Sequence, residues 1–131
     1  MDKAALNRLT EQIIACALDV HRELGPGLLE SCYEECLTFA LLELGLAVER
    51  QKPLPVCFRG QDIRIAYRID LLIENAVIVE VKAVDKFERV HGAQVLTYLR
   101  LADRRVGLLI NFNVKLLMRD GFKRFVYNFP D

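Results

Sequence analysis

The stretch Ala76-Val77-Ile78-Val79-Glu80-Val81-Lys82-Ala83-Val84 decides the fold of this chain. Nearly every position is small and apolar or β-branched, which predicts a strand covered on both faces. Glu80 and Lys82 lie two residues apart, so strand alternation directs both side chains to the same side. Burying these charges costs several kcal/mol per ion unless they are paired or bind something. The two charges therefore indicate a functional site.

A second carboxylate, Asp70, lies in the preceding strand-like run and within hairpin reach of Glu80. Opposed residues of an antiparallel pair point the same way. If Asp70 is opposite Glu80, then Ile73 is opposite Val77 and the loop is Glu74-Asn75-Ala76, a common length in which Asn tolerates the left-handed conformation. A two-residue loop would shift the pairing and turn Glu80 away. A shared site therefore predicts the three-residue loop.

Asp70, Glu80 and Lys82 form the pattern Asp-x9-Glu-x-Lys. Two carboxylates about 4–5 Å apart suit a hard divalent cation such as Mg²⁺, which keeps water ligands and bridges to phosphate oxygens. Lys82 could hold the attacking water or offset charge that develops on phosphate. The alternative is a buried ion pair between Lys82 and one of the two acids. The pattern favours a metal-dependent nuclease.

Two further pairs of polar residues have the four-residue spacing that places them on one helical face. Gln94 and Tyr98 follow the charged strand and could reach the same site. Glu30 and Glu34 lie on an earlier predicted helix. Glu30 either complements that helix's macrodipole or supplies a third carboxylate to the metal.

The periodicity of the remaining chain predicts a mixed α/β sheet flanked by helices, in the order α-α-β-β-β-β-α-β with C-terminal edge strands, as one domain over 1–131. The helices are expected over about 6–24, 28–44 and 85–101, the last opened by a capping box at 85–88. Strands are expected over 47–51, 54–58, 63–73, 76–84 and 106–112, with edge elements at 115–118 and 122–129 and a turn at 59–62. The inward face of the second helix is predicted to comprise Leu29, Cys32, Cys36, Leu37, Ala40 and Leu44, with Gly45 following its end.

The charge is unevenly distributed although the net charge is zero. Residues 1–49 hold nine acidic and three basic side chains, and residues 50–131 hold nine acidic and fifteen basic ones. Such a division could present a basic face to a phosphate backbone, or reflect attraction between halves of one domain or of a dimer. No apolar run is long enough for a bilayer span, and the N-terminus does not resemble a signal peptide. We expect a cytoplasmic protein without a membrane partner.

Cysteine and histidine carry weaker signals. The spacing of the four cysteines favours core filling by free thiols over a disulfide framework or a metal cluster; they are Cys16, Cys32, Cys36 and Cys57. His21 and His91 could each act as a general base or phosphate contact. His21 could equally complement a helix C-terminus, and His91 lies one turn before Gln94.

In combination, these segments resemble the GxxExxY protein family, which is placed in the PD-(D/E)XK nuclease superfamily. The segments are Gly27–Tyr33, Tyr67–Leu72, Ile78–Ala83, Gln94–Tyr98 and Gly107–Asn113, within a match over roughly 8–128. The resemblance implies a restriction-endonuclease-like core with Asp70, Glu80 and Lys82 as the metal-and-catalysis set. It also implies Glu30 as a helix-borne acid and Gln94 and Tyr98 as the QxxxY motif of RecB-like nucleases. Ile69 stands where the superfamily's name has proline.

Together these observations predict Mg²⁺-dependent hydrolysis of nucleic acid, with Mn²⁺ as a substitute ion and DNA favoured over RNA. Asp70, Glu80, Glu30 and the Val81 carbonyl are the expected ligands, and Lys82, Gln94 and Tyr98 complete the catalytic set. The basic candidates for a backbone track are Arg68, Lys86, Arg89, Arg104 and Arg105. The alternatives are an inactive nuclease-fold module that binds nucleic acid or protein, and a structural homodimer with an ion-pair network.

Overall fold

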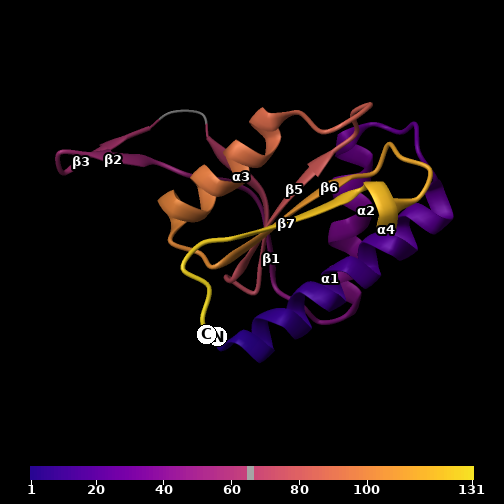
Figure 1. Cartoon of the computed structure of the whole chain (residues 1–131), viewed down its shortest axis with the longest axis horizontal. Helices are drawn as coiled ribbons and strands as arrows, with labels where there is room; N and C mark the ends of the chain where they lie inside the picture. Colours follow the sequence, from indigo (N-terminus) through magenta and orange to yellow (C-terminus); the bar gives the residue numbers. More distant parts are fainter. Residues whose placement is uncertain (65–66) are drawn as a thin grey trace.

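The computed structural model describes residues 1–64 and 67–131 (Figure 1). Its elements are α1 (Lys3–Leu24), α2 (Glu30–Glu43), β1 (Val48–Pro53), β2 (Val56–Phe58), β3 (Gln61–Ile63), β4 (Arg68–Ile73), β5 (Val77–Lys82), α3 (Arg89–Ala102), β6 (Val106–Asn111), α4 (Leu117–Asp120) and β7 (Phe122–Val126). None of the described helices is both long and apolar enough to cross a membrane.

Five of the strands form one mixed sheet in the order β1-β4-β5-β6-β7. β5 and β6 are parallel and joined through α3, whereas the other neighbouring pairs are antiparallel. Helices α1 and α2 lie together on one side of this sheet and α3 lies on the other, as Figure 1 shows. The predicted fold class, a mixed sheet flanked by helices, is confirmed, and the arrangement is that of a restriction-endonuclease-like fold.

The two faces of β5 bury different side chains. Val77, Val79 and Val81 pack in the core beneath α1 and α2, whereas Ile78 packs in the core beneath α3. A strand buried on both faces needs apolar residues at successive positions, which explains the near-continuous apolar run in the sequence. The prediction that this segment is a two-sided buried strand is confirmed.

The first two helices show how far periodicity determines a buried face. In α1 the three- and four-residue spacing predicts a buried stripe of Leu6, Leu9, Ile13, Ala17, Val20 and Leu24. All of these are buried except Leu24, which is 37% exposed and ends the helix before Gly25 with φ 68°. In α2 the predicted face is partly wrong: Leu29 and Leu44 are 76% and 53% exposed. Tyr33 and Leu41 are buried instead. Apolar residues surround α2 on all sides, so sequence alone does not indicate which side contacts the sheet.

Three predicted elements differ from the structure. The strand expected at 63–73 is present only from Arg68 as β4, while Ile63 belongs to β3, which begins at Gln61 inside the predicted turn. The part of that prediction on 65–66 lies outside the described residues. The helix expected from Asp85 begins at Arg89, because Glu88 is the N-cap and forms a capping box with His91. The edge element expected at 115–118 overlaps the short helix α4. The edge strand expected at 122–129 is present as β7.

The hairpin between β4 and β5 has the predicted register, with Ile73 opposite Val77 and a three-residue loop. Both Glu74 and Asn75 have φ 52°. Two hydrogen bonds to Ala47 hold Glu74 in this conformation. The Glu74 N–H donates to the Ala47 carbonyl, and the Ala47 N–H donates to the Glu74 carboxylate. The loop therefore sets the register that brings Asp70 level with Glu80.

Candidate functional site

At Asp70 and Glu80, hydrogen bonds to side chains take the place of the backbone-to-backbone hydrogen bonds between β4 and β5. The Asp70 N–H donates to Glu80 Oε2 at 2.7 Å, and the Val81 N–H donates to Asp70 Oδ2 at 2.9 Å. Each carboxylate thus accepts a hydrogen bond from the backbone of the opposite strand. The two acids thus contact each other's strands, and these contacts orient both groups without a side-chain cation.

β4 changes faces at this position. Ile69 packs in the core beneath α3 and Leu71 in the core beneath α1 and α2, although residues two apart in a regular strand point the same way. Beside this irregularity, Gln51 of β1 has φ 48°, and the recorded pairs of β1 and β4 are Arg50 with Leu71 and Lys52 with Ile69. Local irregularities of strand pairing often re-aim a side chain at a functional site.

Burial makes the ionised forms of the two acids costly. Glu80 is only 2% exposed. Its burial, followed by repulsion from Asp70, raises the pKa of Glu80 to about 8. Burial also raises the pKa of Asp70, although the hydrogen bond from Val81 N–H opposes the shift. The pair is therefore an electrostatically unfavourable arrangement that a nearby positive charge would relieve.

Lys82 lies at the end of β5 and is half-buried. Its charge lowers the pKa of both Asp70 and Glu80, which places the ammonium in their vicinity. Among the described residues, however, no ion pair joins Lys82 to either acid. The purely structural alternative, a buried ion pair, is therefore not what the structure contains.

A polar network behind Asp70 was not predicted from the sequence. Gln51 Nε2 donates to Glu34 Oε1 at 2.7 Å and to Asp70 Oδ1 at 3.2 Å. Glu34 is buried, and its other oxygen accepts from Arg50 Nη2 at 2.9 Å. Gln51 thus connects the site acid to α2. The spacing of Glu34 from Glu30 was visible in the sequence, but nothing there marked Gln51.

The remaining predicted ligands, Glu30 and Val81, line a hollow of about 210 Å³ together with Asp70. Its other lining residues are Ser31, Glu34 and Gln51. Glu30 is the first residue of α2 and is exposed. Its Oε2 accepts from the Ala83 N–H at 3.4 Å, a long contact. The first turn of α2 therefore lies beside the end of β5, and the structure brings Glu30, Asp70 and Val81 to one hollow.

Gln94 and Tyr98 lie together on α3, since Gln94 Nε2 donates to the Tyr98 hydroxyl at 2.9 Å. Tyr98 is 3% exposed. Its pKa is raised first by burial and then by the negative charges of Glu80 and Asp70. Because its oxygen accepts from Gln94, the Tyr98 O–H remains available to donate toward the site.

In the segment Gly25–Tyr33, the contacts of Tyr33 explain why a tyrosine stands there, whereas they do not explain the glutamate at Glu30. The Tyr33 hydroxyl donates to the Gly25 carbonyl at 2.5 Å and accepts from the Leu28 N–H at 3.1 Å. Its ring stacks on Phe112 with centroids 4.6 Å apart. Tyr33 therefore fixes the loop before α2, and with it the position of Glu30.

Asn111 fixes the chain that follows Lys82. Its side-chain oxygen accepts from Val84 N–H at 3.0 Å and from Asn113 N–H at 3.1 Å, and its amide donates to Val84 O at 2.9 Å. Asn111 is 1% exposed and pairs with Lys82 across β5 and β6. Its side chain thus holds the segment that carries Lys82 and contacts Glu30.

We expect Asn111→Ala to lower the free energy of unfolding by about 2–4 kcal/mol, because it removes three hydrogen bonds to the part-buried backbone of Val84 and Asn113. Urea unfolding followed by circular dichroism measures this. Gln12→Ala, which removes an exposed amide on α1, serves as the control. Equal stability of the two variants would show that Asn111 does not anchor this segment.

The two histidines and two of the predicted basic residues contact other parts of the chain. His91 Nδ1 accepts from the Glu88 N–H, so His91 caps α3. His21 Nε2 lies 2.7 Å from the Val114 carbonyl. Arg104 and Arg105 border the β4–β5 turn, where Arg104 donates to Asn75, at the end of β5 opposite Lys82. Their assignment to a phosphate track beside the site was wrong.

The four cysteines are free thiols. Cys16 is buried in the core and Cys36 packs against it, as core filling predicts. Cys57 is exposed on β2, so that prediction is wrong for this residue.

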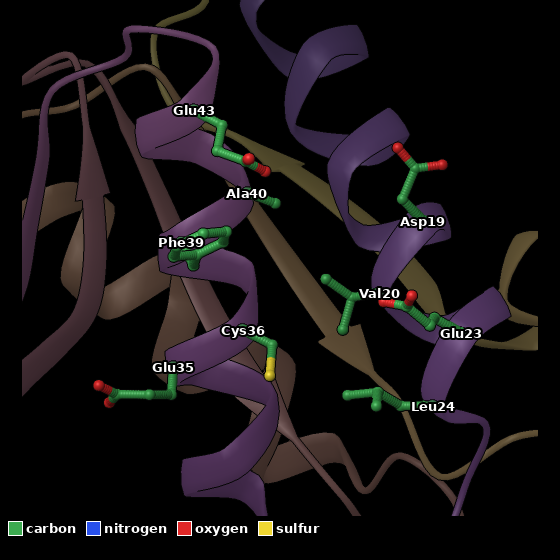
Figure 2. A pocket seen from close by; sticks show the side chains of 9 residues that line it. All are labelled: Asp19, Val20, Glu23, Leu24, Glu35, Cys36, Phe39, Ala40 and Glu43. Atoms are coloured by element: carbon green, nitrogen blue, oxygen red, sulfur yellow. The ribbon is translucent and has the colours of Figure 1, made fainter.

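A groove of about 450 Å³ between α1 and α2 does not contain the paired acids. Figure 2 shows the side chains that line it. Four of its nine lining residues are acidic, so it would repel a phosphate backbone; they are Asp19, Glu23, Glu35 and Glu43. A nucleic-acid site at this groove is therefore unfavourable.

The class of the PD-(D/E)XK proteins is defined by a restriction-endonuclease-like sheet that carries two acids on adjacent strands and a lysine beside them. A family model described as PD-(D/E)XK nuclease superfamily matches residues 7–125. The chain belongs to this superfamily. No curated protein and no solved structure gives a significant match.

Proposed function

We propose that the protein is a Mg²⁺-dependent nuclease, with Mn²⁺ as a substitute ion and DNA as its substrate. The observation that carries this proposal is the pair formed by half-buried Asp70 and buried Glu80, whose pKa values are both raised. Lys82, whose charge acts on both acids, forms no ion pair with them among the described residues. Membership in a nuclease superfamily supports the same conclusion.

The residues present fit a hard divalent ion. Asp70 and Glu80 offer carboxylate oxygens, and the energetic cost of ionising both is the cost that a bound cation would remove. Over the described ranges no three His, Cys, Asp or Glu side chains form a metal site. We therefore propose the two acids, the Val81 carbonyl and water as the direct ligands. The exposed Glu30 carboxylate, which borders the same hollow as Asp70, would join them through a water molecule.

Each residue of the site has a role that follows from its position. Asp70 and Glu80 would hold the ion, whose chemistry is to polarise the phosphate and lower the pKa of a bound water. Lys82, with three N–H donors, would orient the attacking water or stabilise negative charge on the phosphate. The Tyr98 O–H, positioned by Gln94, would donate to a site oxygen. Gln51 would hold Asp70 in place.

Three of the basic residues predicted to contact a phosphate backbone are exposed on the segments that flank the site. Arg68 begins β4, Lys86 lies between β5 and α3, and Arg89 begins α3; all three are exposed. These residues would contact the phosphate backbone. The cytoplasmic location and the homodimer that the sequence suggested stay predictions.

Incubation of the purified protein with linear, nicked and single-stranded DNA tests the proposal. We expect cleavage of at least one substrate with Mg²⁺ or Mn²⁺ and none in the presence of EDTA. Parallel reactions with RNA of the same sequence test the choice of DNA. Absence of cleavage on every substrate with both ions would contradict the nuclease proposal and favour an inactive nucleic-acid-binding or protein-binding module.

A further inference from the structure

Strands β2 and β3 form a separate two-stranded sheet that projects from the end of the main sheet (Figure 1). None of the six residues in these strands is buried. Phe58 is 59% exposed and Ile63 is 41% exposed. An isolated two-stranded hairpin is only marginally stable in water, so it gains little by exposing large apolar side chains. The exposure of these residues therefore points to a ligand.

One face of this hairpin is apolar. Val56 pairs with Ile63 and Phe58 pairs with Gln61, which places these four side chains on the same face. Cys57 and Asp62 pair on the other face. An exposed aromatic ring on a short sheet is a surface on which a flat nucleic-acid base can stack.

The tip of the hairpin carries a positively charged residue, Arg59, at a position whose backbone conformation is unfavourable for a long side chain. Arg59 has φ 50° and the following Gly60 has φ 78°. Asn, Asp or Gly is preferred at the first of these positions, and a long side chain is not. The Arg59 guanidinium lies 5.0 Å from the centre of the Phe58 ring. The tip thus combines an aromatic ring with a cation, the pairing that single-stranded nucleic acid binds.

The base of the hairpin is packed against the candidate site. The Leu54 N–H donates to the Tyr67 carbonyl, and the Tyr67 ring meets the Tyr98 ring edge-on with centroids 6.2 Å apart. Leu54 and Tyr98 belong to the same buried cluster. The hairpin therefore leaves the sheet at the end that carries Asp70 and Tyr98.

We infer that the β2–β3 hairpin is a nucleic-acid-binding arm, whose Phe58 stacks on an unpaired base while Arg59 contacts the adjacent phosphate. The inference rests on the proposed nuclease function and adds a substrate class: DNA with a single-stranded segment beside the cleaved strand. Phe58 follows Gln51, a contact of Asp70, by seven residues. At about 3.3 Å per residue this spans at most about 23 Å, or roughly seven nucleotides.

The test compares DNA binding by the Lys82→Ala protein with that of the same protein carrying Phe58→Ala. Fluorescence anisotropy measures its affinity for a blunt duplex and for that duplex with a ten-nucleotide tail. We expect Phe58→Ala to weaken binding of the tailed probe about tenfold and of the blunt probe less than about twofold. With 2-aminopurine at successive tail positions, quenching by stacking is expected within about seven nucleotides of the duplex and is lost with Phe58→Ala.

Three further variants complete the test. Phe58→Trp keeps an aromatic ring and should retain both affinity and quenching. Arg59→Ala should reduce the slope of log affinity against log salt by about one. Cys57→Ala, on the opposite face of the hairpin, should bind as the parent does. Thermal unfolding confirms that each variant is folded.

Equal weakening of tailed and blunt probes by Phe58→Ala, or unchanged binding of both, would overturn the inference. Dissociation of an oligomer by Phe58→Ala, with DNA binding unchanged, would instead assign the hairpin to a protein interface. Because these readings use a Lys82→Ala protein and measure binding, they are independent of cleavage. Failure of the nuclease proposal is recognised separately, by the absence of cleavage with wild-type protein.

Discussion

Replacing Lys82 with alanine is expected to slow DNA cleavage by about 10²–10⁴-fold while changing the affinity for Mn²⁺ less than about threefold. The lysine lies beside the two acids without forming an ion pair with them among the described residues, so its role is assigned to the reacting phosphate or water and not to metal binding. Single-turnover cleavage at saturating metal measures the rate of the chemical step.

Lys115→Ala is the matched control, because Lys115 is exposed and borders a hollow at the end of α1, with His21 and Pro26. Its cleavage rate should stay within about twofold of the wild-type rate. An unchanged rate in Lys82→Ala would remove Lys82 from the mechanism. A parallel loss of rate and metal affinity would reassign it to supporting the metal ligands.

Replacing Glu80 with glutamine is expected to stabilise the metal-free protein at pH 8 by on the order of 3 kcal/mol, or about 10 °C in Tm. The pKa of Glu80 is raised from an ordinary value of 4.5 to about 8. Between these values the folded protein keeps a proton that the unfolded chain has lost. The free energy of unfolding therefore falls as pH rises through this range, and Gln, which cannot ionise, removes that dependence.

Thermal unfolding in EDTA between pH 5 and pH 8.5 measures the effect. The difference in Tm between Glu80→Gln and wild type should be small near pH 5 and grow toward pH 8. Glu11→Gln, an exposed position on α1, should follow the wild-type curve. A constant difference across the range would mean that Glu80 does not titrate in this interval.

The sequence was sufficient to predict the register of the β4–β5 hairpin. Strand alternation, an apolar run around two charges and a loop of fixed length are local properties, and together they determine a register. The register of β4 and β5 follows this prediction. The spacing of Gln94 and Tyr98 likewise predicted two side chains that contact each other on one helix.

Features that depend on distant contacts were not predictable. The buried face of α2 is selected by the stacking of Tyr33 on Phe112, a residue from the other end of the chain. The contact of Gln51 with Asp70 depends on the change of face in β4 and the unusual backbone of Gln51. The start of α3 depends on a side-chain contact between Glu88 and His91 that competes with an equally plausible cap at Asp85.

The β2–β3 hairpin shows a different limit of prediction from the sequence. The turn residues Arg59-Gly60 were visible, yet the sequence suggested one long strand from 63 to 73 where β3 and β4 are separate. A continuous pattern of apolar and charged residues does not reveal that the chain leaves one sheet to form another. Arg104 and Arg105 were misplaced for a related reason, since charge composition does not indicate which end of a sheet a loop occupies.

Equilibrium binding of Mn²⁺ tests the central claim, that Asp70 and Glu80 hold a divalent ion, most directly. The electron paramagnetic resonance signal of the free ion reports binding without requiring activity. We predict one site in the wild-type protein, affinity weakened at least about tenfold by Asp70→Ala, and unchanged affinity in Glu11→Ala. Absence of binding by wild-type protein, or equal affinity in wild type and Asp70→Ala, would contradict the claim.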